Sequence, residues 1–184
     1  FIDKTRIGGF DDLLEYFGKP KPPKNTTTYK PIIALFSIGL LLAISITWLK
    51  LDAIFNFKTI EWFISISMVL LGLQKLMDLE RFTTMFLSYD LLAQRWVRYS
   101  YIYPFVEAGA GLMMMVGVLT WISAPAALFI ASIGAVSVFK AVYVDKRDLK
   151  CACVGGDSNV PLGFVSLTEN LMMVGMAIWM ITKT

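Results

Sequence analysis

Two cysteines, Cys151 and Cys153, stand one residue apart in the stretch KCACVGGDSNVPLGF, and the chain contains no others. A cysteine reacts as the thiolate, and positive charge nearby favours that form. Three basic residues lie just upstream, partly offset by two aspartates (Lys146, Arg147 and Lys150; Asp148 and Asp157). A disulfide between cysteines this close would close a small, strained ring, and strained disulfides are readily reduced. The pair therefore favours thiol–disulfide exchange over a structural crosslink.

Two other interpretations of the cysteine pair stay open at this stage. The residues are two ordinary thiols near lipid headgroups, or they form a soft site for a single Cu(I) ion. The chain has no histidine, which removes the usual haem and zinc ligands. Its clustered methionines favour apolar packing over copper binding (Met113, Met114, Met115, Met172, Met173 and Met176). We therefore expect no metal site.

Glu107 lies in an apolar run that follows Pro104. A carboxylate inside a membrane is energetically expensive and marks a functional position by default. It needs a partner at similar depth, and the candidates are Gln74, Lys75 and Lys140. We expect Glu107 and Lys75 to form a buried polar pair near one membrane face. That pair is either structural, or part of a proton relay or a contact with a quinone headgroup.

A second glutamate, Glu169, follows the sequence SLT at the start of the last apolar run. The Ser-x-x-Glu spacing is typical of a capping box, in which Ser166 would be the N-cap and Glu169 would bond back to its amide. Gly155 and Gly156 turn the chain between the cysteines and this helix. The pattern predicts a capping role for Glu169 and does not indicate a phosphate-binding loop.

The elements that carry these residues are apolar runs of membrane length. Hydrophobic residues make up 57% of the chain and charged residues 17%, whereas soluble proteins have about 25% charged residues. A bilayer core of about 30 Å requires about twenty apolar residues per helix. The sequence predicts an all-α membrane protein, within a membrane domain 31–184, with five transmembrane helices (about 31–49, 60–77, 101–121, 125–144 and 166–182).

Basic residues indicate how these five helices are oriented. One side of the predicted topology collects 14 of the 17 lysines and arginines, and the other keeps Lys50, Lys58 and Lys183. Cytoplasmic loops carry the excess of positive charge, and tryptophans gather at the interfaces. We therefore expect a multi-pass protein of a bacterial inner membrane. Its N-terminus and Cys-x-Cys loop would be cytoplasmic and its C-terminus periplasmic.

Residues 80–98, between the second and third predicted spans, carry apolar side chains at helical spacing, and their polar side chains lie largely elsewhere. This pattern predicts an amphipathic helix that lies in the membrane interface or packs on a partner protein. Small residues recur on two of the spans, where they let helices approach closely (Ala127, Ala131, Gly134 and Ala135; Ala108, Gly109 and Gly111). We therefore expect a tightly packed bundle.

Three motifs in residues 60–182 together resemble the methylamine utilisation protein MauE and its DoxX-like relatives, which are redox-associated membrane proteins. The motifs are Gly-x-x-Lys-Leu, Pro-x-x-Glu and Cys-x-Cys-x-Gly (Gly72, Lys75 and Leu76; Pro104 and Glu107; Cys151, Cys153 and Gly155). The resemblance implies a bundle of four core helices, to which the first span adds one N-terminal helix. It also implies that the protein assists disulfide formation or maturation of a partner enzyme.

The segment 1–18, FIDKTRIGGFDDLLEYFG, is similar to the closing strand and helix of a glutaredoxin. The Gly-Gly-x-Asp-Asp pattern that helps to hold glutathione in that family is matched here (Gly8, Gly9, Asp11 and Asp12). The resemblance implies glutathione binding where the rest of a glutaredoxin portion is present. Residues 19–30 are rich in proline and lysine and predict a semi-extended linker to the membrane domain.

These features together predict a membrane-embedded thiol–disulfide redox protein. Cys151 and Cys153 would be the exchanging pair, and Glu107 and Lys75 a buried polar pair near the inner membrane face. Glutathione or a quinone would be the compatible cofactors. We expect the lipid bilayer and a redox partner protein or larger membrane complex as partners, and no nucleic acid. The alternative function is that of a non-catalytic accessory subunit of such a complex.

Overall fold

The computed structural model describes residues 29–52, 56–147, 149 and 162–183, and within them every regular element is helical. The predicted glutaredoxin-like segment, most of the linker and the Cys-x-Cys loop lie outside the described residues. The elements are α2 (Lys30–Leu51), α3 (Phe57–Met77), α4 (Leu79–Leu87), α5 (Leu91–Arg95), α6 (Val97–Val116), α7 (Thr120–Phe139), η1 (Lys140–Val144) and α8 (Phe164–Lys183).

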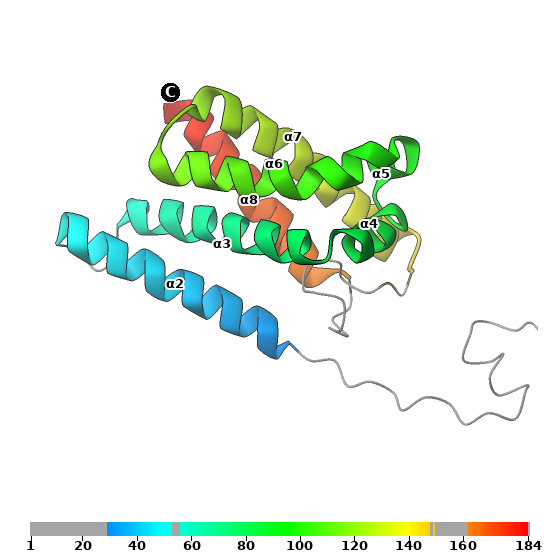
Figure 1. The fold of residues 1–184 in the computed structure, drawn as a ribbon, viewed down its shortest axis with the longest axis horizontal. Coiled ribbons are helices and arrows are strands. Elements are labelled where there is room, and N and C mark those ends of the chain that lie inside the picture. The colour runs from blue at the N-terminus through cyan, green and yellow to red at the C-terminus, as the bar shows by residue number, and fades with distance from the viewer. Residues whose placement is uncertain (1–28, 53–55, 148, 150–161, 184) are drawn as a thin grey trace, which may run out of the picture.

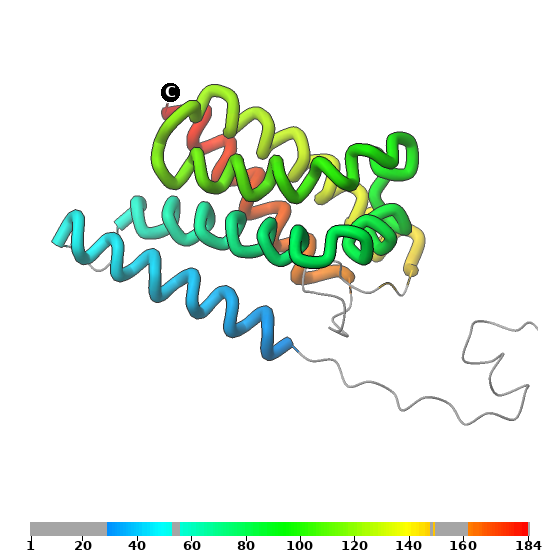
Figure 2. Tube along the Cα trace, in the orientation of Figure 1, coloured from blue at the N-terminus to red at the C-terminus, as the bar shows by residue number. Residues whose placement is uncertain are grey.

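The long helices form a bundle with one helix outside it (Figure 1). Helix α3 packs on α6, α6 on α7, α7 on α8, and α8 again on α3, which closes a ring of four. Helix α2 packs on α3, at the side of the ring (Figure 2). This arrangement agrees with the prediction of four core helices and one N-terminal helix.

Within the described residues, four helices are long and apolar enough to cross a membrane: α2, α3, the continuous Thr120–Val144 and α8. The chain is therefore a multi-pass membrane protein. The third of the five predicted spans corresponds to α6, which is as long as α8 but is not among the four. Its polar residues explain why, since Arg98, Glu107 and three tyrosines interrupt its apolar sequence.

The third predicted span was placed about four residues too late along the chain. We expected 101–121, whereas α6 is Val97–Val116 and α7 begins at Thr120. Gly117 ends α6 with a left-handed φ of 77°, and its N–H donates to the carbonyl oxygen of Met113. The turn is made of residues as apolar as the helices it joins, so hydropathy alone did not show it.

The predicted helix 80–98 is two short helices, α4 and α5, rather than one. The break comes at Asp90, whose Oδ1 accepts hydrogen bonds from the N–H groups of Leu92 (3.0 Å) and Ala93 (2.8 Å). An aspartate in this position starts a new helix. Burial raises the pKa of Asp90, and the hydrogen bonds from Ala93, Ser137 and Leu92 partly offset this effect.

The apolar face of this segment packs on the protein's own bundle. Phe82, Phe86 and Tyr89 are buried. The ring of Phe86 lies 4.8 Å from that of Tyr103 and 6.1 Å from that of Tyr99, both on α6. Aromatic pairs at such separations are stabilising. The amphipathic pattern is present, but the protein's own core buries these three side chains, and α6 contacts Phe82 and Phe86.

Glycines set the closest approach of α3 to α6. A Cβ added to Gly72 would lie 2.8 Å from the Cβ and 2.9 Å from the backbone nitrogen of Ala108. A Cβ added to Gly111 would lie 2.8 Å from the Cβ of Met68. By contrast, a Cβ at Gly109 would meet nothing within 4 Å. The α3–α6 contact therefore depends on Gly72 and Gly111, and not on Gly109.

Gly72→Ala is expected to lower the free energy of unfolding by about 1–3 kcal/mol, as overpacking does in well-packed interiors. Its methyl group would clash with backbone, which cannot move without separating α3 from α6. Thermal unfolding of the purified protein in detergent measures this loss. Gly109→Ala is the matched control on the partner helix and should leave stability unchanged. Equal effects at the two positions would contradict the packing argument.

Candidate functional site

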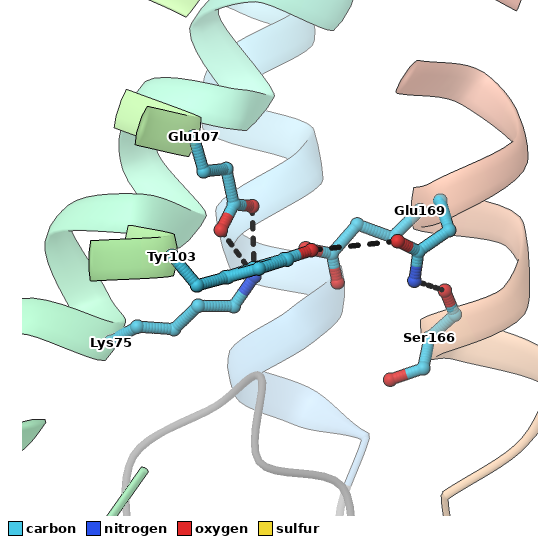
Figure 3. Close-up of polar contacts among 6 residues, drawn as sticks. Lys75, Tyr103, Glu107, Ser166 and Glu169 are labelled. Atoms are coloured by element: carbon cyan, nitrogen blue, oxygen red, sulfur yellow. Dashed lines mark hydrogen bonds and ion pairs between the residues drawn. The ribbon is translucent and has the colours of Figure 1, made fainter. Parts of the chain in front are cut away.

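Three charged side chains from three helices meet inside the bundle: Lys75 of α3, Glu107 of α6 and Glu169 of α8. The Nζ of Lys75 lies 2.8 Å and 2.6 Å from the two carboxylate oxygens of Glu107. It lies 2.6 Å from Oε1 of Glu169. Glu107 is fully buried, and Lys75 and Glu169 are 4% and 5% exposed. We call these three residues the charged cluster; Figure 3 shows Lys75 and Glu107 pointing toward one another.

Aromatic and amide groups surround the charged cluster. The ammonium of Lys75 lies 5.3 Å from the ring centroid of Tyr103 and 6.0 Å from that of Phe82. The hydroxyl of Tyr103 donates to Oδ1 of Asn170 at 3.5 Å, and Nδ2 of Asn170 donates to the carbonyl oxygen of Ser166 at 2.7 Å (Figure 3). These contacts connect α6 to α8 beside the charges and extend the polar network.

Close helix packing brings the cluster together. Lys75 lies one turn after Gly72, so the glycine that admits α6 also brings Glu107 within reach of the ammonium. On the other side, a Cβ added to Gly134 of α7 would lie 2.4 Å from Oδ1 of Asn170. Asn170 therefore occupies space that any larger residue at position 134 would fill. Small residues on α3 and α7 position the polar side chains of α6 and α8.

The cluster contains one ammonium and two carboxyl groups in an environment that is almost inaccessible to solvent. Lys75 contacts both carboxyl groups, and charges buried in a low-dielectric interior are strongly unfavourable without such partners. The arrangement therefore holds two carboxyl groups from two helices within hydrogen-bond distance of the ammonium on a third.

The structure corrects the predicted capping role of Glu169. Helix α8 begins at Phe164, so Ser166 lies inside the helix and is not its N-cap. Glu169 binds Lys75 instead. The Ser-x-x-Glu pattern was misleading because two further residues, Phe164 and Val165, extend the helix at its start. Of the proposed partners of Glu107, Lys75 is the one that binds it, whereas Lys140 is exposed.

Cys151 and Cys153 lie outside the described residues, as do Gly8, Gly9, Asp11 and Asp12. The described residues on either side of the cysteine segment, Leu149 and Leu162, are held together. The N–H of Leu162 donates to the carbonyl oxygen of Leu149 at 2.6 Å. Leu162 is 4% exposed and Leu149 packs against the same apolar core. This anchor lies just before α8, whose second turn carries Glu169.

Among the described residues, no group of three or more histidine, cysteine, aspartate or glutamate side chains is arranged to hold a metal ion. The polar groups assembled in the bundle are instead the ammonium, carboxyl and amide groups of the charged cluster and its neighbours.

Comparison with known proteins agrees with this architecture. The family described as "Methylamine utilisation protein MauE" matches residues 51–183, which is more than half of the chain. The matched region begins at the end of α2 and includes the whole four-helix bundle, all three residues of the charged cluster and both cysteines. No curated protein and no solved structure matches the chain.

Proposed function

The chain belongs to the MauE family, and from this premise we propose that it exchanges electrons with a partner protein through a Cys151–Cys153 thiol–disulfide pair at the membrane. The observation that supports the proposal is that the described residues on either side of the cysteine segment, Leu149 and Leu162, are hydrogen-bonded to each other just before α8. In the sequence, Cys151 and Cys153 follow Leu149 by two and four residues. Under the proposal, the pair would act near the end of the bundle where α8 begins.

The exchange follows ordinary thiol–disulfide chemistry. A thiolate of one partner attacks one sulfur of the other partner's disulfide, which forms a mixed disulfide and releases a thiolate. The second thiol of the attacking pair then displaces that bond. Two electrons and two protons pass in total from the dithiol to the former disulfide. We assign the charged cluster of Lys75, Glu107 and Glu169 the role of holding and releasing a proton during this cycle.

The proposed topology has five spans, with α6 as the fifth. Helix α6 packs between α3 and α7, both of which are long and apolar enough to span, and it buries Tyr99, Tyr103 and Glu107 in the bundle interior. Lys50, Lys58 and Lys183 gather at one end, and the basic side chains of α4 to η1 lie toward the other. The excess of positive charge would make that second end, with the cysteines, the cytoplasmic face of a bacterial inner membrane.

The partner in this scheme is a glutaredoxin-like domain or a separate redox protein. Gly8, Gly9, Asp11 and Asp12 would contribute to glutathione binding if the remainder of a glutaredoxin portion is present. A short tether would raise the effective concentration of such a domain at Cys151 and Cys153. A quinone is the compatible second acceptor, since the buried cluster supplies groups for proton transfer.

Trapping of the thiols in isolated membranes tests the proposal. With a maleimide that adds mass, the native chain should carry two labels after reduction and none after mild oxidation. Cys151→Ser and Cys153→Ser should each carry one label after reduction and should no longer form the internal disulfide. The double variant is the unlabelled control, because the chain has no other cysteine. Identical labelling of reduced and oxidised native protein would refute the exchange function.

A further inference from the structure

A second polar site lies at the opposite end of the bundle from the start of α8. It is an open cavity of about 550 Å³ lined by the end of α2, the start of α3, the α6–α7 turn and the end of α8. Its lining combines three lysines, one glutamate and a methionine floor (Lys50, Lys58, Lys183, Glu61, Met114 and Met180). We call this space the lysine cavity.

The positive charge in the lysine cavity exceeds the negative charge. Lys58 and Lys183 bind separate oxygens of Glu61, at 2.6 Å and 2.5 Å, and the indole N–H of Trp179 donates to the same carboxylate at 2.8 Å. Lys50 has no carboxylate partner among the described residues, and its ammonium lies 6.0 Å from the ring centroid of Trp62. With Glu61 already satisfied, the lysines of the cavity retain two positive charges beyond its one negative charge.

The cavity is amphiphilic and lies at a membrane interface. Met114 and Met180 form an apolar floor that is nearly inaccessible to solvent. Trp48, Trp62, Trp121 and Trp179 are all found at this end of their helices. Tryptophan rings prefer the headgroup region of a bilayer. The lysines are therefore at the depth of lipid phosphates, and the methionines below them are at the depth of acyl chains.

We propose that the lysine cavity binds an anionic phospholipid, with the headgroup phosphate on Lys50 and the lysines paired with Glu61, and the upper acyl chain over the methionine floor. An ammonium donates up to three charge-assisted hydrogen bonds to phosphate oxygens. An anionic headgroup neutralises the excess charge, whereas a zwitterionic headgroup brings its own cation. Free phosphate has the charge but not the apolar part that the floor accommodates. This site is separate from the proposed thiol chemistry.

Native mass spectrometry of the full chain in mild detergent, titrated with phosphatidylglycerol or phosphatidylcholine, tests the assignment. We expect tight binding of one phosphatidylglycerol and weaker binding of phosphatidylcholine. Lys50→Gln should weaken phosphatidylglycerol binding about tenfold, the effect of losing one charged hydrogen bond. Lys50→Arg should retain it. The matched control is Lys140→Gln at the exposed first residue of η1, which should leave binding unchanged.

Two outcomes would overturn the proposal. The first is equal binding of phosphatidylglycerol by the native chain and the Lys50→Gln variant. The second is full displacement of phosphatidylglycerol by millimolar inorganic phosphate, which would identify the free anion as the ligand. Because Lys50 is solvent-exposed, its substitution should not unfold the protein, and an unchanged thermal midpoint verifies this. The redox-dependent labelling of the cysteines should also be unaffected by these variants.

Discussion

Replacing Lys75 with methionine is expected to lower the free energy of unfolding by about 3–5 kcal/mol, the usual result of removing one partner from a buried ion pair. This loss of stability arises from the two buried carboxyl groups that the substitution leaves in place. Glu107 and Glu169 would be left without the ammonium that lies within 2.8 Å of three of their oxygens. The two carboxyl groups would lose these charge-assisted hydrogen bonds and still be buried, which destabilises the folded state.

Thermal unfolding in detergent measures this effect. A loss of this size should lower the midpoint by on the order of 10 °C for a chain of this length. Lys140→Met is the matched control, since it removes an exposed lysine from α7's continuation and should leave the midpoint unchanged. Glu107→Gln should be milder than Lys75→Met, because one carboxylate still balances Lys75. A native midpoint for Lys75→Met would show that the cluster contributes little to stability.

The sequence predicted the helices well because their length and hydropathy are dictated by the bilayer. The predicted helix boundaries were wrong where local hydrogen bonding, and not hydropathy, determines where a helix ends. The left-handed Gly117 ends α6 inside an apolar stretch, and the Asp90 cap divides what looked like one amphipathic helix. At both positions the helical backbone hydrogen bonds end, while the apolar side chains continue along the sequence. The periodicity of apolar residues therefore does not reveal either helix end.

The charged cluster was predicted in part. An intramembrane carboxylate and a lysine at similar depth were enough to pair Glu107 with Lys75. Glu169 was assigned to a cap because its local pattern has a common local explanation. The information that the sequence lacked is the packing of α8 on α3. This packing brings Glu169, which lies one turn into the last span and next to Asn170, to Lys75. Sequence spacing within one helix could not show that contact.

The packing glycines illustrate the same difference between pattern and contact. Gly109 belongs to a small-residue run, yet a Cβ there would touch nothing within 4 Å. Gly72 and Gly134 stand directly against a facing helix. The small-residue pattern identified Gly134 but not Gly72, which the sequence analysis named only within a family motif. The rotation of each helix determines which small residues face a neighbouring helix. This rotation depends on contacts distant in sequence, such as Lys75 with Glu107.

A fully neutral cluster separates the structural from the functional role of these charges. The triple variant Lys75→Met, Glu107→Gln and Glu169→Gln removes all three charges of the charged cluster. Replacing a buried ionic group by neutral residues of similar volume is often neutral or stabilising by about 1–4 kcal/mol. We therefore expect the triple variant to recover most of the stability that Lys75→Met loses, with a thermal midpoint close to that of the native chain.

The same triple variant should be defective in exchange if the cluster holds the proton that accompanies electron transfer. Removal of a group that gives or takes a proton slows a reaction by about 10²–10⁴-fold. The measurement is the rate at which the reduced Cys151–Cys153 pair is reoxidised in membranes, followed by maleimide trapping. Recovery of both stability and rate would make the charges dispensable for the chemistry. If the triple variant recovers its stability but not its exchange rate, the buried ammonium and carboxyl groups are needed for proton transfer and not for folding.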